Sequence, residues 1–307
     1  MRRGGYAVAM HDAQNPPAPA PGRAPRALLF GGSGPIGCRV AGAMRHAGWQ
    51  LVALSRQPRA SQPGIAWRVG ALPDGAGDGA GFDAVVSCGP LDLFSQWYAR
   101  VETGAARVVA FGSTSVHVKG DSPDAAERAL AARLREGEAR VAAAAAARGA
   151  AATLLRPTLV YGAGGDRNLS RVATLARRHS FFVLPHDARG LRQPVHVDDL
   201  AAAALAALGW RGPGVRGYDL PGGETLAYRD MVARVLAALS PPRRLWLLPG
   251  PLFSVAALAA RGLGLHDAGA AVLARMRQDL AFDAGPARRD LGYAPRAFVP
   301  DAGMFGG

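Results

Sequence analysis

The chain has 307 residues, of which 49% are hydrophobic and 19% charged. These proportions exclude an intrinsically disordered chain and allow one substantial core, or a core with a smaller lobe. The formal net charge is +13, but Lys119 is the only lysine, and the arginines are scattered singly or in short pairs. Without a basic stripe or a nucleic-acid-binding motif, this charge indicates solvated surface arginines rather than a nucleic-acid partner.

The first 25 residues contain Arg2-Arg3 and five prolines between Pro16 and Pro25. An export signal would need a longer apolar segment than "YAVAM". We therefore expect residues 1–25 to be a disordered, proline-rich tail, or alternatively expect translation to start at Met10.

From residue 26 onward, strand-like and helix-like patterns alternate. "ALLF" (27–30) predicts a buried strand, and the apolar spacing of Ile36, Val40 and Met44 predicts the inner stripe of a helix that ends near Gly48. Further strands are expected at 50–55, 83–89, 106–113 and 152–162, with a long helix at 124–148. Residues 193–208 begin as a strand and enter a helix, with Asp198 or Asp199 placed to cap it.

Beyond about residue 220 the alternation gives way to helices and irregular turns. The pattern predicts an α/β protein with a parallel sheet covered by helices and a smaller C-terminal lobe. The expected sheet domain spans 26–220, and the lobe spans 221–307. The apolar stretch "LWLLPGPLFSVAALAA" from Leu245 is broken by proline and glycine and falls short of the ~20 residues of a bilayer span, so no integral membrane segment is expected.

The two cysteines, Cys38 and Cys88, form no disulfide framework, and no spacing in the sequence suits a metal. Cysteine usage of this kind is typical of a reducing compartment, so the predicted location is the cytoplasm, and no metal site is expected.

The stretch "GGSGPIG" (31–37) lies directly between a predicted strand and a predicted helix. In such a turn one glycine allows positive φ, one lets the backbone approach a pyrophosphate, and one lets helix and strand pack closely. A Walker-type loop is excluded, because Cys38-Arg39 stands where Lys-Ser/Thr is required. The spacing predicts a dinucleotide site whose contacts are Gly31, Ser33, Gly34, Pro35, Ile36 and Gly37, with Cys88 and Gly89 at the end of the 83–89 segment.

The end of the second strand indicates which dinucleotide is bound. An acidic residue there would bind the ribose 2′-OH of NAD, but this chain has Ser55 and Arg56 instead. A guanidinium can bind a 2′-phosphate bidentately, and Arg39 in the following helix could assist. We expect NADP, with NAD as the alternative.

Several motifs together resemble the short-chain dehydrogenase/reductase superfamily, in its extended branch of NAD-dependent epimerase/dehydratase-like proteins. They are "GGSGPIG", "FGSTSVHV", "EGEARV", "LLRPTLVYG", "QPVHVDDLA" and "YDLPGGETLAYRDMV". The resemblance implies a Rossmann-like, doubly wound NAD(P)-binding domain over 26–220, with 163–193 contributing to the substrate cleft, and a substrate lobe over 221–307. It also implies hydride chemistry on a sugar nucleotide or a related alcohol or carbonyl. Dimers formed through helices are common in that superfamily, so a homodimer is a further implication.

The resemblance also implies a Tyr-x-x-x-Lys pair on the long helix, which this sequence lacks. Counting back from Glu138, Leu130 and Leu134 fill the two places, and none of the tyrosines has a lysine four residues on. The family's "FGSTSVHV" region implies Ser113 as the residue that orients a carbonyl. His117, where the family often has tyrosine, is the candidate substitute acid, because its ordinary pKa suits proton transfer near neutral pH. Ala71 stands where the family often has an acidic residue near adenine.

The same resemblance places the substrate cleft beside "YGAGGDRNLSRV" and "LRQPVH". Residues there that could grip an anionic or polyhydroxylated small molecule are Arg167, Asn168, Arg192, Gln193 and His196. Each could equally be a surface or loop-stabilising residue. Two functions stay open: an atypical NADP-dependent oxidoreductase or epimerase-like enzyme, and a catalytically silent dinucleotide-binding protein that acts as a redox sensor or assembly subunit.

Overall fold

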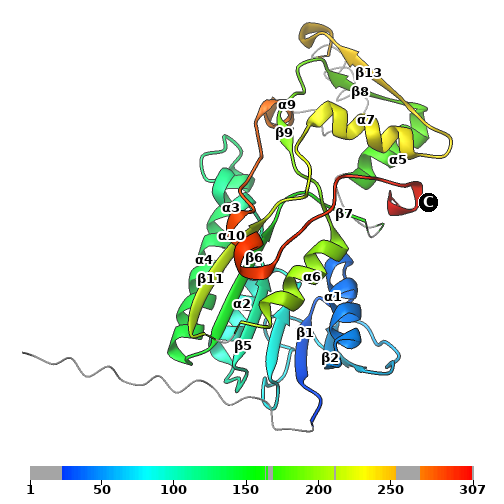
Figure 1. Cartoon of the computed structure of the whole chain (residues 1–307). Coiled ribbons are helices and arrows are strands. Elements are labelled where there is room, and N and C mark those ends of the chain that lie inside the picture. Colours follow the sequence, from blue (N-terminus) through cyan, green and yellow to red (C-terminus); the bar gives the residue numbers. More distant parts are fainter. Residues whose placement is uncertain (1–22, 163, 165–168, 211, 254–269, 306–307) are drawn as a thin grey trace, which may run out of the picture.

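The computed structural model describes residues 23–162, 164, 169–210, 212–253 and 270–305, so residues 1–22 of the predicted tail lie outside it (Figure 1). Its centre is a seven-stranded sheet in the order β11-β6-β5-β4-β1-β2-β3, in which all neighbouring strands are parallel. The strands are β1 (Arg26–Phe30), β2 (Gln50–Ser55), β3 (Ile65–Val69), β4 (Ala84–Ser87), β5 (Arg107–Phe111), β6 (Ala151–Pro157) and β11 (Gly214–Leu220).

The strand order reverses between β1 and β4, which confirms the predicted doubly wound sheet. The chain moves outward from β1 to β3, returns to the other side of β1 as β4, and moves outward again. Open sheets of this kind bind ligands beyond the carboxyl ends of the strands, at the point of reversal. The glycine loop directly follows β1 and therefore lies at that point.

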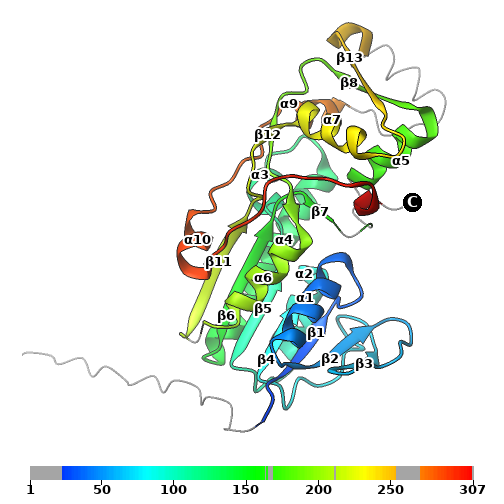
Figure 2. The same ribbon diagram turned by 45° about the vertical axis from the view of Figure 1, so that its right-hand side comes forward.

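Helices cover both faces of the sheet (Figures 1 and 2). On one face α1 (Pro35–His46) packs against α6 (Val197–Ala207), and on the other α2 (Leu91–Arg100) packs against α4 (Ala125–Ala147). Alternate side chains of each strand supply the two cores, since Leu29 joins the α1/α6 side and Leu28 the α2/α4 side. Burial on both faces explains why these strands read as continuous apolar runs. The four-residue helix α3 (Ser115–Val118) follows β5 and contacts α4.

A second group of elements lies beyond the carboxyl ends of the strands (Figure 2). It consists of α5 (Leu169–His179), β8 (Phe181–Pro185), α7 (Tyr228–Ala238), β13 (Arg244–Leu248), α9 (Ala270–Arg277) and a 3₁₀ turn at Ala302–Phe305. β8 pairs with β13 in parallel, and a separate core that includes Val172, Met231 and Phe298 fills the space between the elements. Two short pairs join this lobe to the sheet: β7 (Val160–Tyr161) with β10 (Val195–His196), and β9 (Leu191–Arg192) with β12 (Leu226–Ala227).

The chain crosses between sheet and lobe more than once. α5 and β8 precede residue 220 but pack in the lobe, whereas α10 (Gly285–Leu291) follows it and packs on β11 and α6. The apolar faces of these helices, rather than their order in the chain, decide where they lie. A single boundary at residue 220 stays a prediction.

The start of α6 corrects one expectation. His196, not Asp198 or Asp199, is the N-cap, and its side chain accepts a hydrogen bond from the Asp198 amide. Both aspartates lie within the first helical turn, where they complement the helix dipole, and Asp199 pairs with Arg296. The expected strand 152–162 is also interrupted at Thr158, so that it forms β6 and β7.

Within the described part of the chain, no helix is long and apolar enough to span a bilayer. The apolar stretch that starts at Leu245 begins as β13, and its residues after 253 lie outside the described ranges. Nor do three or more His, Cys, Asp or Glu side chains gather as metal ligands among the residues that the structure describes.

Candidate dinucleotide and catalytic site

Gly31 lets the chain turn sharply after β1. Its φ is +69°, a conformation that L side chains rarely adopt, and a Cβ there would lie 2.7 Å from the carbonyl carbon of Cys88. The turn is closed by the Gly34 amide, which donates to the Gly31 carbonyl at 2.9 Å. Gly31 therefore allows both the turn and the close approach of β1 to the end of β4.

Gly37 allows α1 to pack directly on this turn. A Cβ at Gly37 would lie 2.0 Å from the Gly31 carbonyl oxygen, so only glycine fits without moving the helix. Gly34 is the N-cap of α1, with Pro35 in the first turn, and a Cβ at Gly34 would have only the Gly31 oxygen within 4 Å. The predicted turn and packing roles thus match the geometries of Gly31 and Gly37, and the approach of Gly34 to a pyrophosphate stays a prediction.

The N-terminus of α1 has the features of an anion site. No side-chain cap hydrogen bond satisfies its first amides, and no acidic residue lies in its first turn. Amides and the helix dipole at such an end favour a phosphate. Ser33 is exposed beside the turn, while Ile36 is half-buried against the α1/α6 core.

Cys88 and Gly89 form the neighbouring wall. The Cys88 amide donates to the Phe30 carbonyl at 2.9 Å, which holds the end of β4 against β1. Burial raises the pKa of the Cys88 thiol well above its ordinary range, so this wall is uncharged. Leu72, just after β3, approaches Gly89, and the neighbouring Ala71 is exposed.

The end of β2 presents one guanidinium. Ser55 is buried, and its hydroxyl accepts a hydrogen bond from the Gln57 amide at 3.3 Å, so it shapes the turn. Arg56 is exposed directly after it. Arg39 points elsewhere, because its Nε lies 3.4 Å from the Asp198 carboxylate on α6.

Ser113 and His117 lie one turn apart after β5. The Ser113 hydroxyl donates to Ser115 Oγ at 3.1 Å and accepts from the Ser115 amide, so it also supports the start of α3. The ring of His117 is 41% exposed, and its Nε2 lies 3.0 Å from Asp219 Oδ1 at the end of β11. Sequence reasoning missed Asp219, although it lies in the "YDLPGG" motif that carried the family resemblance.

The helix α4 has Leu130 and Leu134 where the family resemblance implies tyrosine and lysine. Both are half-buried, and Leu134 packs against the α2/α4 core. One turn further on, Glu138 accepts two hydrogen bonds from Arg156 of β6, at 2.7 and 2.8 Å. A bidentate pair of this kind fixes α4 to the sheet.

Two of the expected substrate residues are engaged by the protein itself. Arg192 is buried, donates to the carbonyls of Leu191, Gln278 and Arg275, and lies over the Tyr228 ring. His196 is buried under Tyr161 as the cap of α6. Arg167 and Asn168 lie outside the described residues.

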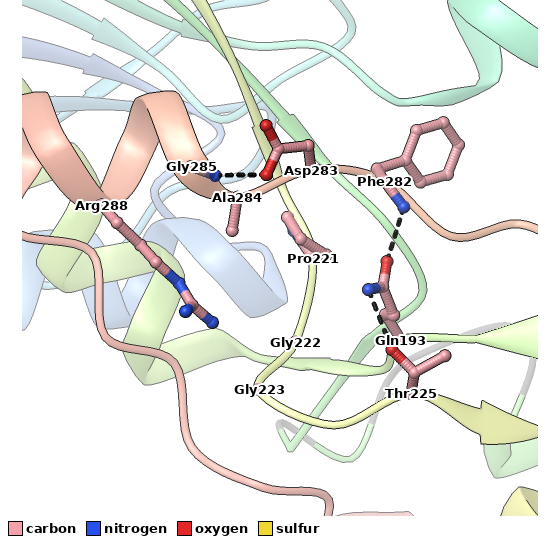
Figure 3. Close-up of a pocket in the computed structure, with 10 residues that line it drawn as sticks. All are labelled: Gln193, Pro221, Gly222, Gly223, Thr225, Phe282, Asp283, Ala284, Gly285 and Arg288. Carbon is pink, nitrogen blue, oxygen red and sulfur yellow. Dashed lines mark hydrogen bonds between the residues drawn. The ribbon is translucent and has the colours of Figure 1, made fainter.

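Gln193 lines a small cavity of about 260 Å³ between the β11–β12 connection and the start of α10 (Figure 3). Both ends of its amide are used, since Nε2 donates to Thr225 Oγ1 at 3.1 Å and Oε1 accepts from the Phe282 amide at 2.8 Å. Arg288 lies on the other side of the cavity. The full lining is Gln193, Pro221, Gly222, Gly223, Thr225, Phe282, Asp283, Ala284, Gly285 and Arg288.

Known proteins resemble this chain in part of its sequence and in its fold. Residues 89–218 match the model of the NAD dependent epimerase/dehydratase family. No curated protein matches the chain. Among solved structures, a UDP-galactose 4-epimerase is similar with a TM-score of 0.65 and 17% identity, over 90% of this chain and 95% of that one.

Two further solved structures contain ligands. The UDP-glucose-4-epimerase of Stenotrophomonas maltophila, with bound NAD and formylated UDP-arabinopyranose, has a TM-score of 0.64 and 18% identity, over 89% of this chain and 94% of that one. MoeE5, in complex with UDP-glucuronic acid and NAD, has a TM-score of 0.62 and 19% identity over the same shares. Over residues 89–218 this chain therefore matches the NAD dependent epimerase/dehydratase family, its fold is that of the sugar-nucleotide epimerases, and the resemblance found in its sequence is confirmed.

Proposed function

We propose that the chain binds NADP along the carboxyl edge of its sheet and acts as an atypical oxidoreductase or epimerase on a carbonyl or alcohol of a sugar-nucleotide-like substrate. The observation that carries the proposal is the Gly31–Gly37 turn, in which an uncapped helix N-terminus follows β1 at the reversal of the sheet. We infer a cytoplasmic location from the two free cysteines, and a homodimer from the family resemblance.

Arg56 supports NADP as the dinucleotide. Its exposed guanidinium follows β2, where a 2′-phosphate would accept two hydrogen bonds from it. Arg39 would first have to leave Asp198, so we assign it the smaller part in binding the 2′-phosphate. NAD is the alternative, because solved structures of similar fold contain it.

Ser113 and His117 are the residues that we assign to the chemical step. When bound, the nicotinamide would supply or accept a hydride. The Ser113 hydroxyl would hold the substrate oxygen, and the His117 ring would exchange a proton with it, with solvent restoring that proton through the exposed side of the ring.

Leu130 and Leu134 favour the second function, a silent dinucleotide-binding protein. Neither side chain can transfer a proton, and loss of a general acid or base typically costs about 10²–10⁴ in rate. A protein that keeps its dinucleotide loop without such a group could act as a redox sensor or as a stabilising subunit of an assembly.

One assay separates the two functions. The purified protein is incubated with NADPH and a panel of ketones and sugar nucleotides, and cofactor oxidation is followed by absorbance. The enzyme function predicts turnover that falls in Ser113→Ala and in His117→Ala but persists in the exposed-site controls Ser61→Ala and His179→Ala. Binding without turnover across the panel would favour the silent function, and turnover that survives both test variants would remove the assigned residues.

A further inference from the structure

A continuous series of contacts between four side chains runs from α4 to the ring of His117. Glu138 of α4 binds Arg156 of β6 at 2.7 and 2.8 Å, and Arg156 Nη1 lies 3.7 Å from Asp219 of β11. Asp219 Oδ1 then lies 3.0 Å from His117 Nε2. Residues 156 and 219 are register partners on adjacent strands, so the sheet itself sets their separation.

Two glycines leave room for this series of side-chain contacts. A Cβ at Gly217 would lie 2.8 Å from the nitrogens of Arg156, and one at Gly112 would lie 3.4 Å from Glu138 Oε1. The hydrogen bond with Glu138 raises the pKa of Arg156 against the opposing effect of burial, so the guanidinium stays charged beside Asp219. Asp219 thus faces a permanent cation on one side and an imidazole on the other.

We propose that Asp219 is the positioning residue of His117. Asp219 holds Nε2–H of the ring, which leaves Nδ1 as the atom that exchanges a proton with the substrate. No hydrogen bond to Nδ1 is found among the described residues, and Phe282 lies beside the ring with its centroid at 6.0 Å. A carboxylate that fixes one ring nitrogen in this way sets the tautomer and the orientation of the other.

This inference rests on the proposed function for its chemical step. The hydride from NADPH forms the new C–H bond at the carbonyl carbon, and the proton on His117 Nδ1 moves to the carbonyl oxygen. The products are NADP⁺ and an alcohol, and the neutral ring keeps its Nε2–H bond to Asp219 until solvent restores the Nδ1 proton. Because the ring of His117 is 41% exposed, its pair with the half-buried Asp219 contributes little to stability, and Asp219 has its main effect on ring orientation.

The test is histidine NMR combined with kinetics on the full chain. In protein labelled with ¹⁵N-histidine, His117→Ala identifies the His117 signals, and long-range ¹H–¹⁵N correlations report which ring nitrogen is protonated. We expect the Nε2–H tautomer in the unmodified chain and a mixture of tautomers in Asp219→Ala. Asp219→Asn keeps an oxygen acceptor and should give an intermediate result. Asp230→Asn, at an exposed aspartate on α7, is the matched control that should change nothing.

Kinetics give the second readout. We expect Asp219→Ala to lower kcat by about 100-fold while KM and the Kd for NADPH stay unchanged, since neither contact involves Asp219. The inference is overturned if His117 has the Nδ1–H tautomer, if its signals are the same in Asp219→Ala, or if kcat survives a change of tautomer. Absence of turnover in the unmodified chain would instead contradict the proposed function, and the positioning of His117 would then be decided by the tautomer measurement alone.

Discussion

His117 and His196 show how one residue type takes two roles in this molecule. His117 lies in α3, which follows β5 of the central sheet, and His196 is the last residue of the short strand β10. The ring of His117 is half-exposed beside Asp219, whereas His196 is 4% exposed and caps α6. Gly162 explains the difference, because its φ of +103° and missing Cβ leave space for the His196 ring.

The cap formed by His196 makes stability depend on pH. Burial, and then the charge of Arg296, lowers the pKa of His196 below its ordinary value. The histidine therefore contributes its full stability above about pH 6.5, its pKa in the unfolded chain, and loses it as the pH falls through the lower folded pKa. Denaturant unfolding should show a loss of up to about 1.4 kcal/mol per pH unit in that window. His196→Asn, which keeps an oxygen cap, should remove this loss, and His179→Asn should not; an identical slope in both would contradict the role.

Arg56 carries the prediction for dinucleotide choice. Arg56→Gln should weaken NADPH binding by about tenfold, the loss of one charge-assisted contact, and leave NADH binding unchanged. Arg59→Gln is the matched control, because Arg59 follows on the same segment but lies over the Trp67 ring. Equal titrations of both variants with NADPH would remove Arg56 from the site.

At the scale of elements, α1 packs closely on the turn after β1 because Gly37 has no side chain. Gly37 packs on the Gly31 carbonyl, whereas Gly42, one turn and a half further along α1, has nothing within 4 Å of its Cβ position. Gly37→Ala should lower the free energy of unfolding by about 2–3 kcal/mol through overpacking. Gly42→Ala in the same helix should raise it by about 0.5–1 kcal/mol. Denaturant unfolding of the two variants measures both, and equal effects would contradict the packing described for α1.

The elements that the sequence predicted well are the central strands and the longest helix. The expected 27–30, 50–55 and 124–148 segments correspond to β1, β2 and α4 within about two residues. Continuous apolar runs mark the two strands, and a long stretch of helix-forming residues marks α4. The two-residue strands of the β7–β10 and β9–β12 pairs were not predicted, because they form only through tertiary contact. The prediction of Asp198 or Asp199 as the N-cap of α6 was wrong, although the local sequence favours both. The packing of His196 against Gly162 places the histidine at the N-cap instead.

At the scale of the whole molecule, one carboxylate ties the lobe to the sheet domain. Glu127 of α4 is buried, accepts from Ser122 at 2.7 Å, lies 3.2 Å from Lys119 Nζ and pairs with Arg275 of α9. Burial raises the pKa of Glu127, but the hydrogen bonds from Ser122 and Lys119 outweigh it and bring the pKa below its ordinary value. Sequence could not join residues 127 and 275, because only the folded path of the chain brings them together.

Breaking this contact should loosen the lobe. Glu127→Gln should cost about 3 kcal/mol, because the cations around it lose their buried partner. Asp74→Asn breaks the exposed pair with Arg100 and should cost less than about 1 kcal/mol. Hydrogen exchange should accelerate at residues 274–284 in Glu127→Gln only; unchanged exchange there would show that the lobe is held by its apolar contacts alone.

The most direct measurement is calorimetric titration of NADPH and NADH into the unmodified chain and into Gly34→Asp. Gly34 has the N-cap position, so aspartate there should keep or raise the melting temperature while its charge occupies the place of the phosphates. Gly104→Asp, at an exposed glycine with open space around it, is the matched control. We predict that the unmodified chain and Gly104→Asp bind the dinucleotide and that Gly34→Asp does not. An unmodified chain that binds neither dinucleotide, or a folded Gly34→Asp that binds as before, would contradict the account.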